Sequence, residues 1–371
     1  MRILVDYRPA LRARTGVGEY IHTIVSAYTA IHDDAVTLFT SSWKDRPSPS
    51  VARELRARVV DRRVPVSVLN YLWHRLEWPA VETLAGTFDV VHAAHPLLIP
   101  SRRAARIVTI HDLFFLLNPQ HTRAEIRRDY AELAASHARR AEAVITSSEH
   151  TKRLVIDHLG VSPERVYICP PGAPTWQTLG RAPNNPHNGY ILFLGTLEPR
   201  KNLDVLLDAY ATLLRGSRRV PPLVIAGGAS PDARSWLQRI AGEPLKHHIR
   251  YTGYVANEER EALYAGARAL VLPSFDEGFG LPVLEAMSAG VPVVTSNRGS
   301  LPEVVGGAGV LLDPSDVPAW ADAIERLTTD APWTTALASA GLARARSFTW
   351  QRSADELHRA YLDAAARRRE R

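Results

Sequence analysis

The feature that most constrains the fold is an alternation of short apolar, β-branched runs with longer amphipathic segments along the whole chain. This alternation predicts parallel strands joined by helices, because parallel strands are buried on both faces and need a crossover between them. In the first half we expect strands at 2–6, 36–40, 90–92, 107–110, 143–146 and 166–168. The sequence therefore predicts an α/β protein built on doubly wound parallel sheets.

A segment rich in proline and glycine, 169–188, interrupts this alternation and cannot sustain a helix or a central strand. Beyond it the pattern restarts with six apolar runs: YILFLG, PLVIAGG, IRYTGYV, RALVLPS, PVVTSN and AGVLLDP. The 371 residues also exceed what one hydrophobic core normally accommodates. We expect an N-terminal domain at 1–172, a linker at 173–188, a C-terminal domain at 189–345 and a last helix within 346–371 that can cross back to the first domain.

Composition excludes several classes of protein. Hydrophobic residues make up 46% and charged residues 23% of the chain, as in an ordinary folded protein. No apolar run approaches the length of a membrane-spanning helix, and the single cysteine, Cys169, cannot form an internal disulfide. We therefore expect a cytoplasmic protein rather than a membrane-spanning or secreted one.

The formal net charge is +6, and the first half of the chain holds nearly all of the excess. Arginine clusters there fit contact with an anionic membrane surface, at the inner face of the membrane, or with a phosphate-bearing acceptor. A solvated arginine-rich surface explains them equally well. We expect no nucleic-acid binding, since aromatic platforms are not interleaved with the basic residues.

The most informative segment runs from 274 to 305, SFDEGFGLPVLEAMSAGVPVVTSNRGSLPEVV. It predicts a strand end, a glycine-rich loop holding Glu277, and a helix opened by Pro282, where free backbone N–H groups favour a polar ligand. Glu285 follows eight positions later, and we expect it in the first turn of that helix. The two carboxylates could accept hydrogen bonds from a sugar and from a ribose, whereas singly each is explained by solvation or by the helix dipole.

A second motif, GTLEPRKN at 195–202, places Arg200 and Lys201 just before a predicted helix. Positive charge is unfavourable at a helix N-terminus, so the pair needs an anion. A pyrophosphate would satisfy it, with Arg200 making bidentate contacts. Two solvated loop cations are the alternative.

The first half offers weaker candidates. Gly16 and Gly18 in TGVGEY resemble part of a dinucleotide fingerprint, although helix capping also explains them. His111 ends the predicted strand IVTIH, where ligand-binding residues lie in open α/β sheets, and we expect it to bind a ligand hydroxyl unless it is a structural histidine. We interpret His92 and His95 as structural rather than as metal ligands.

Taken together, these motifs resemble the family-4 retaining glycosyltransferases of the GT-B fold over essentially the whole chain. Members show an acid-x7-acid pattern in an EGFGLPxLEAMAxGxPVV setting, matched here from Glu277 to Glu285 with a departure at Ser288. The resemblance implies two Rossmann-like domains that face each other across a cleft. It further implies that Glu285 binds the ribose, Glu277 the donor sugar, and Arg200 and Lys201 the diphosphate.

The resemblance extends to other positions. It implies that Phe279, Gly280 and Leu281 offer backbone N–H groups to the donor, that Tyr254 and Val255 contact the base, and that Gly16, Gly18 and His111 complete the site from the first domain. The expected catalytic residues are His111, Arg200, Lys201 and Glu277.

The implied reaction moves a sugar from a nucleotide diphosphate to a hydroxyl of a glycan or lipid-linked acceptor, with retention of configuration. We expect no cofactor and no metal, because no Asp-x-Asp pair occurs in the chain to bracket a divalent ion. The TGVGEY and IVTIHDL segments look most like mannosyltransferases of bacterial polysaccharide assembly, which favours GDP-mannose as donor. The alternatives are a nucleotide-sugar epimerase or hydrolase, and a non-catalytic nucleotide-sugar binding subunit.

Overall fold

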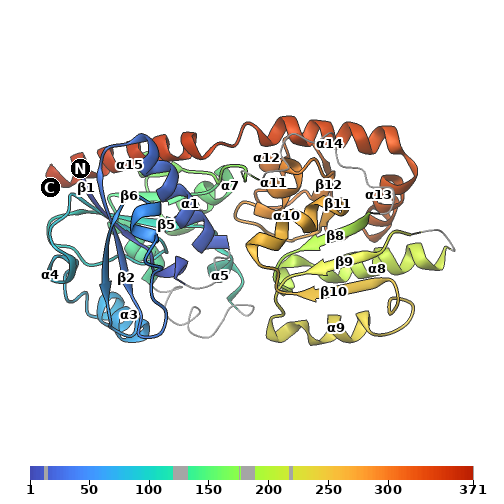
Figure 1. Cartoon of the computed structure of the whole chain (residues 1–371), viewed down its shortest axis with the longest axis horizontal. Coiled ribbons are helices and arrows are strands. Elements are labelled where there is room, and N and C mark those ends of the chain that lie inside the picture. The colour runs from blue at the N-terminus through green and yellow to red at the C-terminus, as the bar shows by residue number, and fades with distance from the viewer. Residues whose placement is uncertain (12–15, 120–132, 175, 177–188, 217–219, 371) are drawn as a thin grey trace. The chain divides into compact units, whose positions relative to one another are not determined.

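The computed structural model describes residues 1–11, 16–119, 133–174, 176, 189–216 and 220–370. Within these residues the chain divides into two compact units, each with its own sheet and core (Figure 1). The first unit comprises Met1–Gly172 and Thr349–Arg371, and the second comprises Ala173–Phe348. At the boundary, the Ala173 backbone N–H donates to the Phe348 carbonyl, which ties the two ends of the second unit to each other. Most of the expected linker at 173–188 lies outside the described residues.

The first unit contains a seven-stranded parallel sheet in the order β3-β2-β1-β4-β5-β6-β7. Its strands are β1 (Arg2–Asp6), β2 (Ala35–Ser41), β3 (Arg58–Arg62), β4 (Val90–Ala93), β5 (Ala105–Ile110), β6 (Ala143–Thr146) and β7 (Val166–Ile168). Sequence analysis predicted all of them except β3. That strand, RVVDR, lies at the edge of the sheet, and its two apolar residues are too few to give a strand pattern.

Helices cover both faces of this sheet. They are α1 (Gly16–Ile31), α2 (Val51–Glu54), α3 (Val66–Arg75), α4 (Val81–Ala85), α5 (Phe114–Leu117), α7 (Glu149–Leu159) and α15 (Trp350–Arg369), with the short 3-10 turns η1 (Arg8–Ala10) and η3 (Pro163–Arg165). Ile3 and Val5 belong to the core that α1 and α15 cover, whereas Leu4 belongs to a second core with Trp73 of α3. Alternate residues of one strand thus enter opposite cores, as doubly wound sheets require. Among the described helices, none is long and apolar enough to cross a bilayer.

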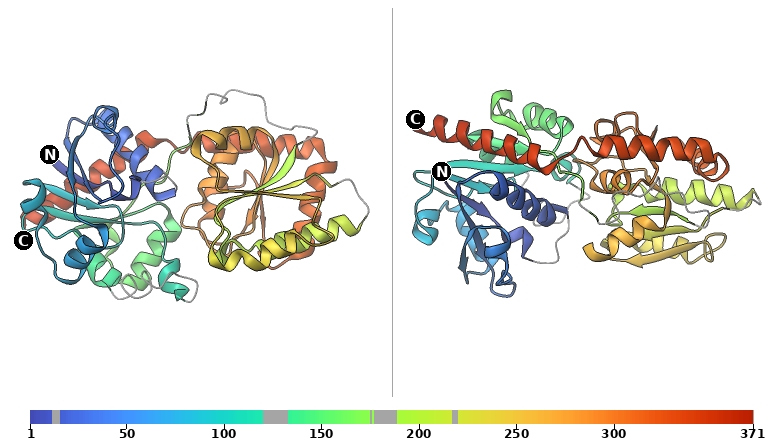
Figure 2. Two further views of the ribbon diagram at one scale, coloured as in Figure 1. Left: turned by 60° about the horizontal axis from the view of Figure 1, so that its bottom comes forward. Right: turned by 45° about the horizontal axis from the view of Figure 1, so that its top comes forward.

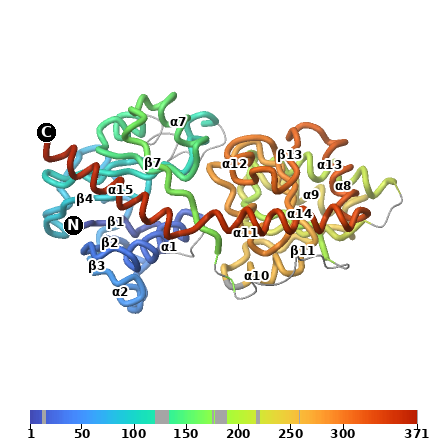
Figure 3. The backbone as a smooth tube through the Cα atoms, turned by 90° about the horizontal axis from the view of Figure 1, so that it is seen from above, coloured from blue at the N-terminus to red at the C-terminus, as the bar shows by residue number. Residues whose placement is uncertain are grey.

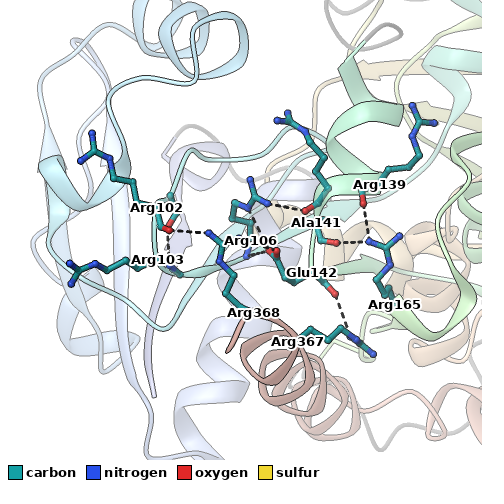
Figure 4. A network of polar contacts seen from close by, with 12 residues as sticks. Arg102, Arg103, Arg106, Arg139, Ala141, Glu142, Arg165, Arg367 and Arg368 are labelled. Atoms are coloured by element: carbon teal, nitrogen blue, oxygen red, sulfur yellow. Dashed lines mark hydrogen bonds and ion pairs between the residues drawn. The ribbon is translucent and has the colours of Figure 1, made fainter. Parts of the chain in front are cut away.

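The last helix, α15, returns to the first unit and packs along α1 and over β4 to β7 (Figure 3). Arginines hold its end in place. Arg367 donates to the Glu142 carbonyl at 3.3 Å, and Arg368 donates to the Arg102 carbonyl at 2.9 Å (Figure 4). Both contacts lie at the amino-terminal edge of the sheet. Beside them the buried carboxylate of Glu142 accepts the Arg106 backbone N–H at 2.7 Å. The C-terminal helix α15 is therefore part of the first unit and covers one face of its sheet.

The second unit contains a six-stranded parallel sheet in the order β10-β9-β8-β11-β12-β13. The strands are β8 (Tyr190–Leu194), β9 (Leu223–Ala226), β10 (Ile249–Gly253), β11 (Ala267–Leu272), β12 (Val293–Ser296) and β13 (Val310–Leu312), one in each predicted run. The helices are α8 (Leu203–Arg215), α9 (Arg234–Ile240), α10 (Asn257–Ala265), α11 (Leu281–Ser288), α12 (Leu301–Val305), α13 (Val317–Thr329) and α14 (Ala331–Ala345), with turns η4 (Pro199–Lys201) and η5 (Pro231–Ala233).

Each sheet has a point at which the strand order reverses, between β1 and β4 in the first unit and between β8 and β11 in the second. The second sheet and its covering helices are seen from two directions in Figure 2. At such a switch point the loops that follow the two neighbouring strands diverge, which leaves room for a ligand at the carboxyl ends. The predicted fold class, α/β with two doubly wound parallel sheets, is confirmed.

Candidate active site

Three predicted residues meet at the switch point of the second sheet. Arg200 and Lys201 lie on η4, after β8, and Glu277 lies in the loop after β11. The Lys201 Nζ is 2.5 Å from one Glu277 carboxylate oxygen, and an Arg200 Nη is 2.9 Å from the other. Lys201 and Glu277 are both buried, each with 5% of its surface exposed. The structure thus brings together an acid and two cations that lie 76 and 77 residues before it in the sequence.

Backbone geometry fixes this cluster. Asn202, which ends η4, adopts a left-handed conformation with φ +51°, and its side-chain amide donates to the carbonyls of Pro273 and Pro314. The Phe275 N–H donates to the Arg200 carbonyl at 2.8 Å. The loops after β8 and β11 are therefore tied to each other directly. Ser274 completes the arrangement by donating its hydroxyl to Glu277 at 2.7 Å.

The pKa values of Glu277 and Lys201 are set by burial and by the charges beside each group. Burial alone would raise the pKa of Glu277, but Lys201 and Arg200 outweigh it and lower this pKa to about 2. Burial lowers the pKa of Lys201 below its ordinary value, against the opposing effect of Glu277. Glu277 is therefore an ionised carboxylate at neutral pH, with a cation on each side.

The sequence analysis expected Arg200 and Lys201 to need an anion, and the structure places protein carboxylates beside both. Glu277 contacts both, and Glu198 contacts the Arg200 Nε at 2.5 Å. The unfavourable charge at the start of α8 is thus compensated by the chain itself. Asp204, in the first turn of α8, adds a favourable charge to the same helix end.

Glu285 occupies a separate polar cluster. Its carboxylate oxygens accept hydrogen bonds from Arg260 at 2.6 Å and from the Tyr264 hydroxyl at 2.8 Å. Because α11 begins at Leu281, Glu285 lies in the second turn of the helix rather than in the first, as the sequence analysis expected. A dipole preference at the helix start therefore does not explain this residue.

The residues between the two acids form the start of α11. Gly280 precedes the helix with φ +96°, a conformation open to glycine, and a Cβ there would come within 2.7 Å of Leu301. Leu281 is the first helical residue. The Phe279 side chain is buried and packs edge-on against Phe348, so only its backbone is available to a ligand.

The remaining predicted residues of this unit lie elsewhere. Tyr254 and Val255 follow β10, the edge strand of the sheet, two positions from β8. The Tyr254 side chain is half exposed. Val255 packs against the core of the second unit.

In the first unit, His111 directly follows β5. Burial lowers the pKa of His111 to about 4, so the ring is neutral at physiological pH. Its Nε2 is buried and has no hydrogen-bond partner among the described residues, while the edge of the ring packs against Tyr20 at 5.3 Å between centroids. A buried polar atom without a partner requires an explanation, and a bound ligand is one.

Gly16 and Gly18 lie in the first turn of α1. A Cβ at Gly18 would be 2.7 Å from the Pro9 carbonyl oxygen, so this glycine permits close packing of α1 on η1. At Gly16, φ is +31°, and a Cβ would meet nothing within 4 Å. The close approach at Gly18 is thus made by the chain's own backbone.

The two histidines interpreted as structural make internal contacts. His92 bonds to the Tyr361 hydroxyl at 2.8 Å and to Thr109 at 2.7 Å, and His95 lies 3.2 Å from buried Asp6. Among the described residues, no group of three or more acidic, histidine or cysteine side chains is arranged to hold a metal ion.

Comparisons with known proteins identify the family of the chain. The family model described as Glycosyltransferase Family 4 matches residues 14–177, and the model described as Glycosyl transferases group 1 matches residues 188–330. The chain is 32% identical to O-antigen chain mannosyltransferase B of Escherichia coli, over 97% of this chain and 99% of that protein. The chain is a family-4 glycosyltransferase.

The fold of the glycosyltransferase is GT-B. It resembles sucrose-phosphate synthase from Thermosynechococcus elongatus with a TM-score of 0.75 and 20% identity, over 97% of this chain and 98% of that one. It also resembles Anabaena HepE in complex with UDP-glucose, with a TM-score of 0.71 and 20% identity, over 97% and 98% of the two chains.

Sequence reasoning missed several partners in the glycosyltransferase site. Arg260 and Tyr264 hold Glu285, and Ser274 and Glu198 support the cluster at Glu277. Arg260 and Tyr264 lie four residues apart on α10, and this i, i+4 spacing places them on one helix face. The spacing indicates that Arg260 and Tyr264 act on one side of α10. Nothing in the sequence indicates that this side contacts Glu285 of α11.

Gly299 gives a direct test of the loop that carries Glu277. A Cβ at Gly299 would lie 2.7 Å from the Glu277 backbone nitrogen and 2.9 Å from its carbonyl oxygen. Gly307 also has a positive φ, but a Cβ there would meet nothing within 4 Å. We expect Gly307→Ala to cost about 1 kcal/mol for its backbone conformation, and Gly299→Ala a further 1–3 kcal/mol for displacing the loop. Urea denaturation measures both, and equal losses would contradict the steric argument.

Proposed function

We propose that the enzyme transfers a mannosyl group from GDP-mannose to a hydroxyl of a glycan or lipid-linked acceptor, with retention of configuration and without a metal. The observation that carries the donor site is the cluster of Arg200, Lys201 and Glu277 at the switch point of the second sheet. The relative from Escherichia coli is named a mannosyltransferase, which supports mannose as the sugar.

Lys201 and Arg200 supply the positive charge for the diphosphate. The Lys201 ammonium has three N–H donors, of which the described residues use one, for Glu277. Further donors can therefore reach phosphate oxygens. In a buried setting these charges act more strongly on the leaving diphosphate than they would in water. We infer metal independence from this cation pair and from the lack of an Asp-x-Asp pair in the sequence.

In the proposed same-face displacement, the bond between the anomeric carbon and the phosphate oxygen breaks. The acceptor oxygen forms the new bond on the same face of the sugar, and its proton passes to the departing phosphate oxygen. The products are the glycosylated acceptor and the nucleoside diphosphate. Glu277, ionised and held by two cations, balances positive charge that develops on the sugar.

His111 and Glu285 bind hydroxyl groups in this proposal. The neutral His111 ring has an Nε2 lone pair that can accept a hydrogen bond from a hydroxyl. Arg260 and Tyr264 orient the Glu285 carboxylate. This carboxylate accepts hydrogen bonds from the ribose hydroxyls.

Nucleotide binding tests the donor assignment. We expect GDP to raise the melting temperature more than UDP or ADP, with and without magnesium, because a ligand that binds only the folded state stabilises it. We expect Glu285→Gln to weaken GDP binding by roughly tenfold or more, since a hydrogen bond to a charged group contributes about 1.5–3 kcal/mol. The exposed Asp322→Asn on α13 is the control.

Titration calorimetry with GDP measures the affinities. Unchanged GDP affinity in Glu285→Gln would leave that residue a structural role. Stabilisation by UDP alone would show that the donor carries uridine diphosphate instead of guanosine diphosphate. Release of the sugar without an acceptor would favour the hydrolase alternative.

A further inference from the structure

Large apolar side chains are exposed on and around α3 to an unusual degree. Tyr71, Leu76 and Trp78 are 61%, 57% and 62% exposed, and Val66 and Val68 at the start of the same segment are also exposed. Within 13 residues, 66–78, lie five of the 13 large apolar side chains that are exposed in the described chain. Exposed apolar side chains that gather in one short segment make it a candidate interaction surface.

The pattern follows from the amphipathic character of α3. Leu69 and Trp73 are buried against the sheet, and the Trp73 indole donates to the Pro79 carbonyl at 3.1 Å. Tyr71 and Arg75 are exposed and lie four residues apart, so they share the outer face of the helix. Tyrosine and tryptophan on an outer face suit a boundary between water and an apolar phase, because each has an apolar body and a polar group.

Exposed arginines lie beside this segment. The Val81 N–H donates to the Pro100 carbonyl at 2.8 Å, which places the loop that contains Arg102 and Arg103 next to the chain that follows Trp78. Both arginine side chains are exposed and extend away from the polar network in Figure 4.

The acidic side chains near this loop are already engaged. Glu77 forms an ion pair with Arg140 at 2.7 Å. The Glu82 carboxylate accepts hydrogen bonds from the Ser101 hydroxyl and from the backbone N–H groups of Arg102 and Arg103. The charge presented outward is therefore positive.

We propose that Tyr71, Leu76, Trp78, Arg102 and Arg103 form a docking face for the surface of an anionic lipid bilayer. Aromatic and aliphatic side chains enter the boundary between headgroups and acyl chains, while arginines attract anionic headgroups. Two copies of the chain related by a twofold axis would instead bring like charges together. Nucleic acid would use the aromatic rings but not the aliphatic side chains. The inference goes beyond the proposed reaction and does not depend on the donor.

Vesicle co-sedimentation tests the proposal with the full chain. We expect binding to vesicles of two parts phosphatidylcholine and one part phosphatidylglycerol, and little binding to phosphatidylcholine alone. The double variant Arg102→Ala/Arg103→Ala should bind about 25-fold more weakly, at roughly fivefold for each arginine near the surface. Tyr71→Ser/Trp78→Ser should lose at least tenfold. The controls Arg234→Ala and Leu311→Ser, exposed positions of the second unit, should bind as the unmodified chain does.

The proposal is overturned if the unmodified chain does not bind anionic vesicles, or if both double variants bind them as tightly as the unmodified chain does. It is also overturned if light scattering reveals a dimer that Tyr71→Ser/Trp78→Ser dissociates, or if single-stranded DNA binds more tightly than vesicles and displaces them. Thermal stabilisation by GDP, measured on the same variants, distinguishes failure of this proposal from failure of the proposed function, because these residues are not among those proposed to bind the donor.

Discussion

Replacing Lys201 with methionine is expected to lower the free energy of unfolding by about 3–5 kcal/mol, because it leaves a buried carboxylate without its nearest partner. Lys201 and Glu277 are both buried, and their charged atoms lie 2.5 Å apart. Methionine keeps a similar volume, so the loss reports charge rather than a cavity. Transfer should fall by at least about 100-fold, the scale of one lost group that stabilises developing charge. Denaturation and initial-rate measurements provide the two values.

The double variant Lys201→Met/Glu277→Gln separates stability from catalysis. Removing both charges leaves a buried neutral pair, so we expect most of the lost stability to return. Activity should stay low, because the diphosphate still lacks the ammonium. If the double variant regained activity, Lys201 would have only a structural role. If stability did not return, the ion pair would not be the source of the loss.

Acidification from pH 7 to 5.5 is expected to lower the free energy of unfolding by about 5 kcal/mol through four histidines of the first unit. Burial lowers the pKa of His74 to about 2, of His92 to about 3, and of His111 and His137 to about 4. The unfolded chain binds protons at these positions below about pH 6.5, and the folded chain does not. Their folded pKa values are depressed, so stability falls as pH falls through 6.5 and continues to fall toward pH 4.

Urea denaturation at several pH values measures the proton uptake on unfolding, which should approach four between pH 6 and 5. His92→Gln should reduce the uptake by about one. Uptake near zero in this range would show that the buried histidines are protonated in the folded state.

The positions of strands and of motifs could be predicted from the sequence, whereas contacts between distant segments could not. The apolar runs of the second unit each gave a strand, and EGFGLP marked the turn into α11. The pairing of Glu277 with Lys201 depends on β8 lying beside β11, and sequence periodicity carries no information on strand order. For the same reason Arg200 was expected to need an external anion. The edge strand β3 was missed because its residues do not form a buried run.

The side-chain contacts of Glu285 could not be predicted from the sequence either. Its sequence spacing from Glu277 was visible, but its partners Arg260 and Tyr264 come from another helix. At His111, the end of a strand predicted a position near a ligand. Only the structure reveals that its Nε2 is buried without a partner in the described residues.

The closure of the first unit by α15 has a consequence for synthesis of the chain. The second unit is one continuous segment, Ala173–Phe348, whereas the first needs Thr349–Arg371 to cover one face of its sheet. Chains emerge from the ribosome from the N-terminus at about 5–20 residues per second, and domains generally fold as units. The half of the protein made first therefore completes its core last, after the terminal helix has left the ribosome. Until then, the apolar side chains of Ile3, Val5 and Ile107 remain partly uncovered, while the second unit can already fold.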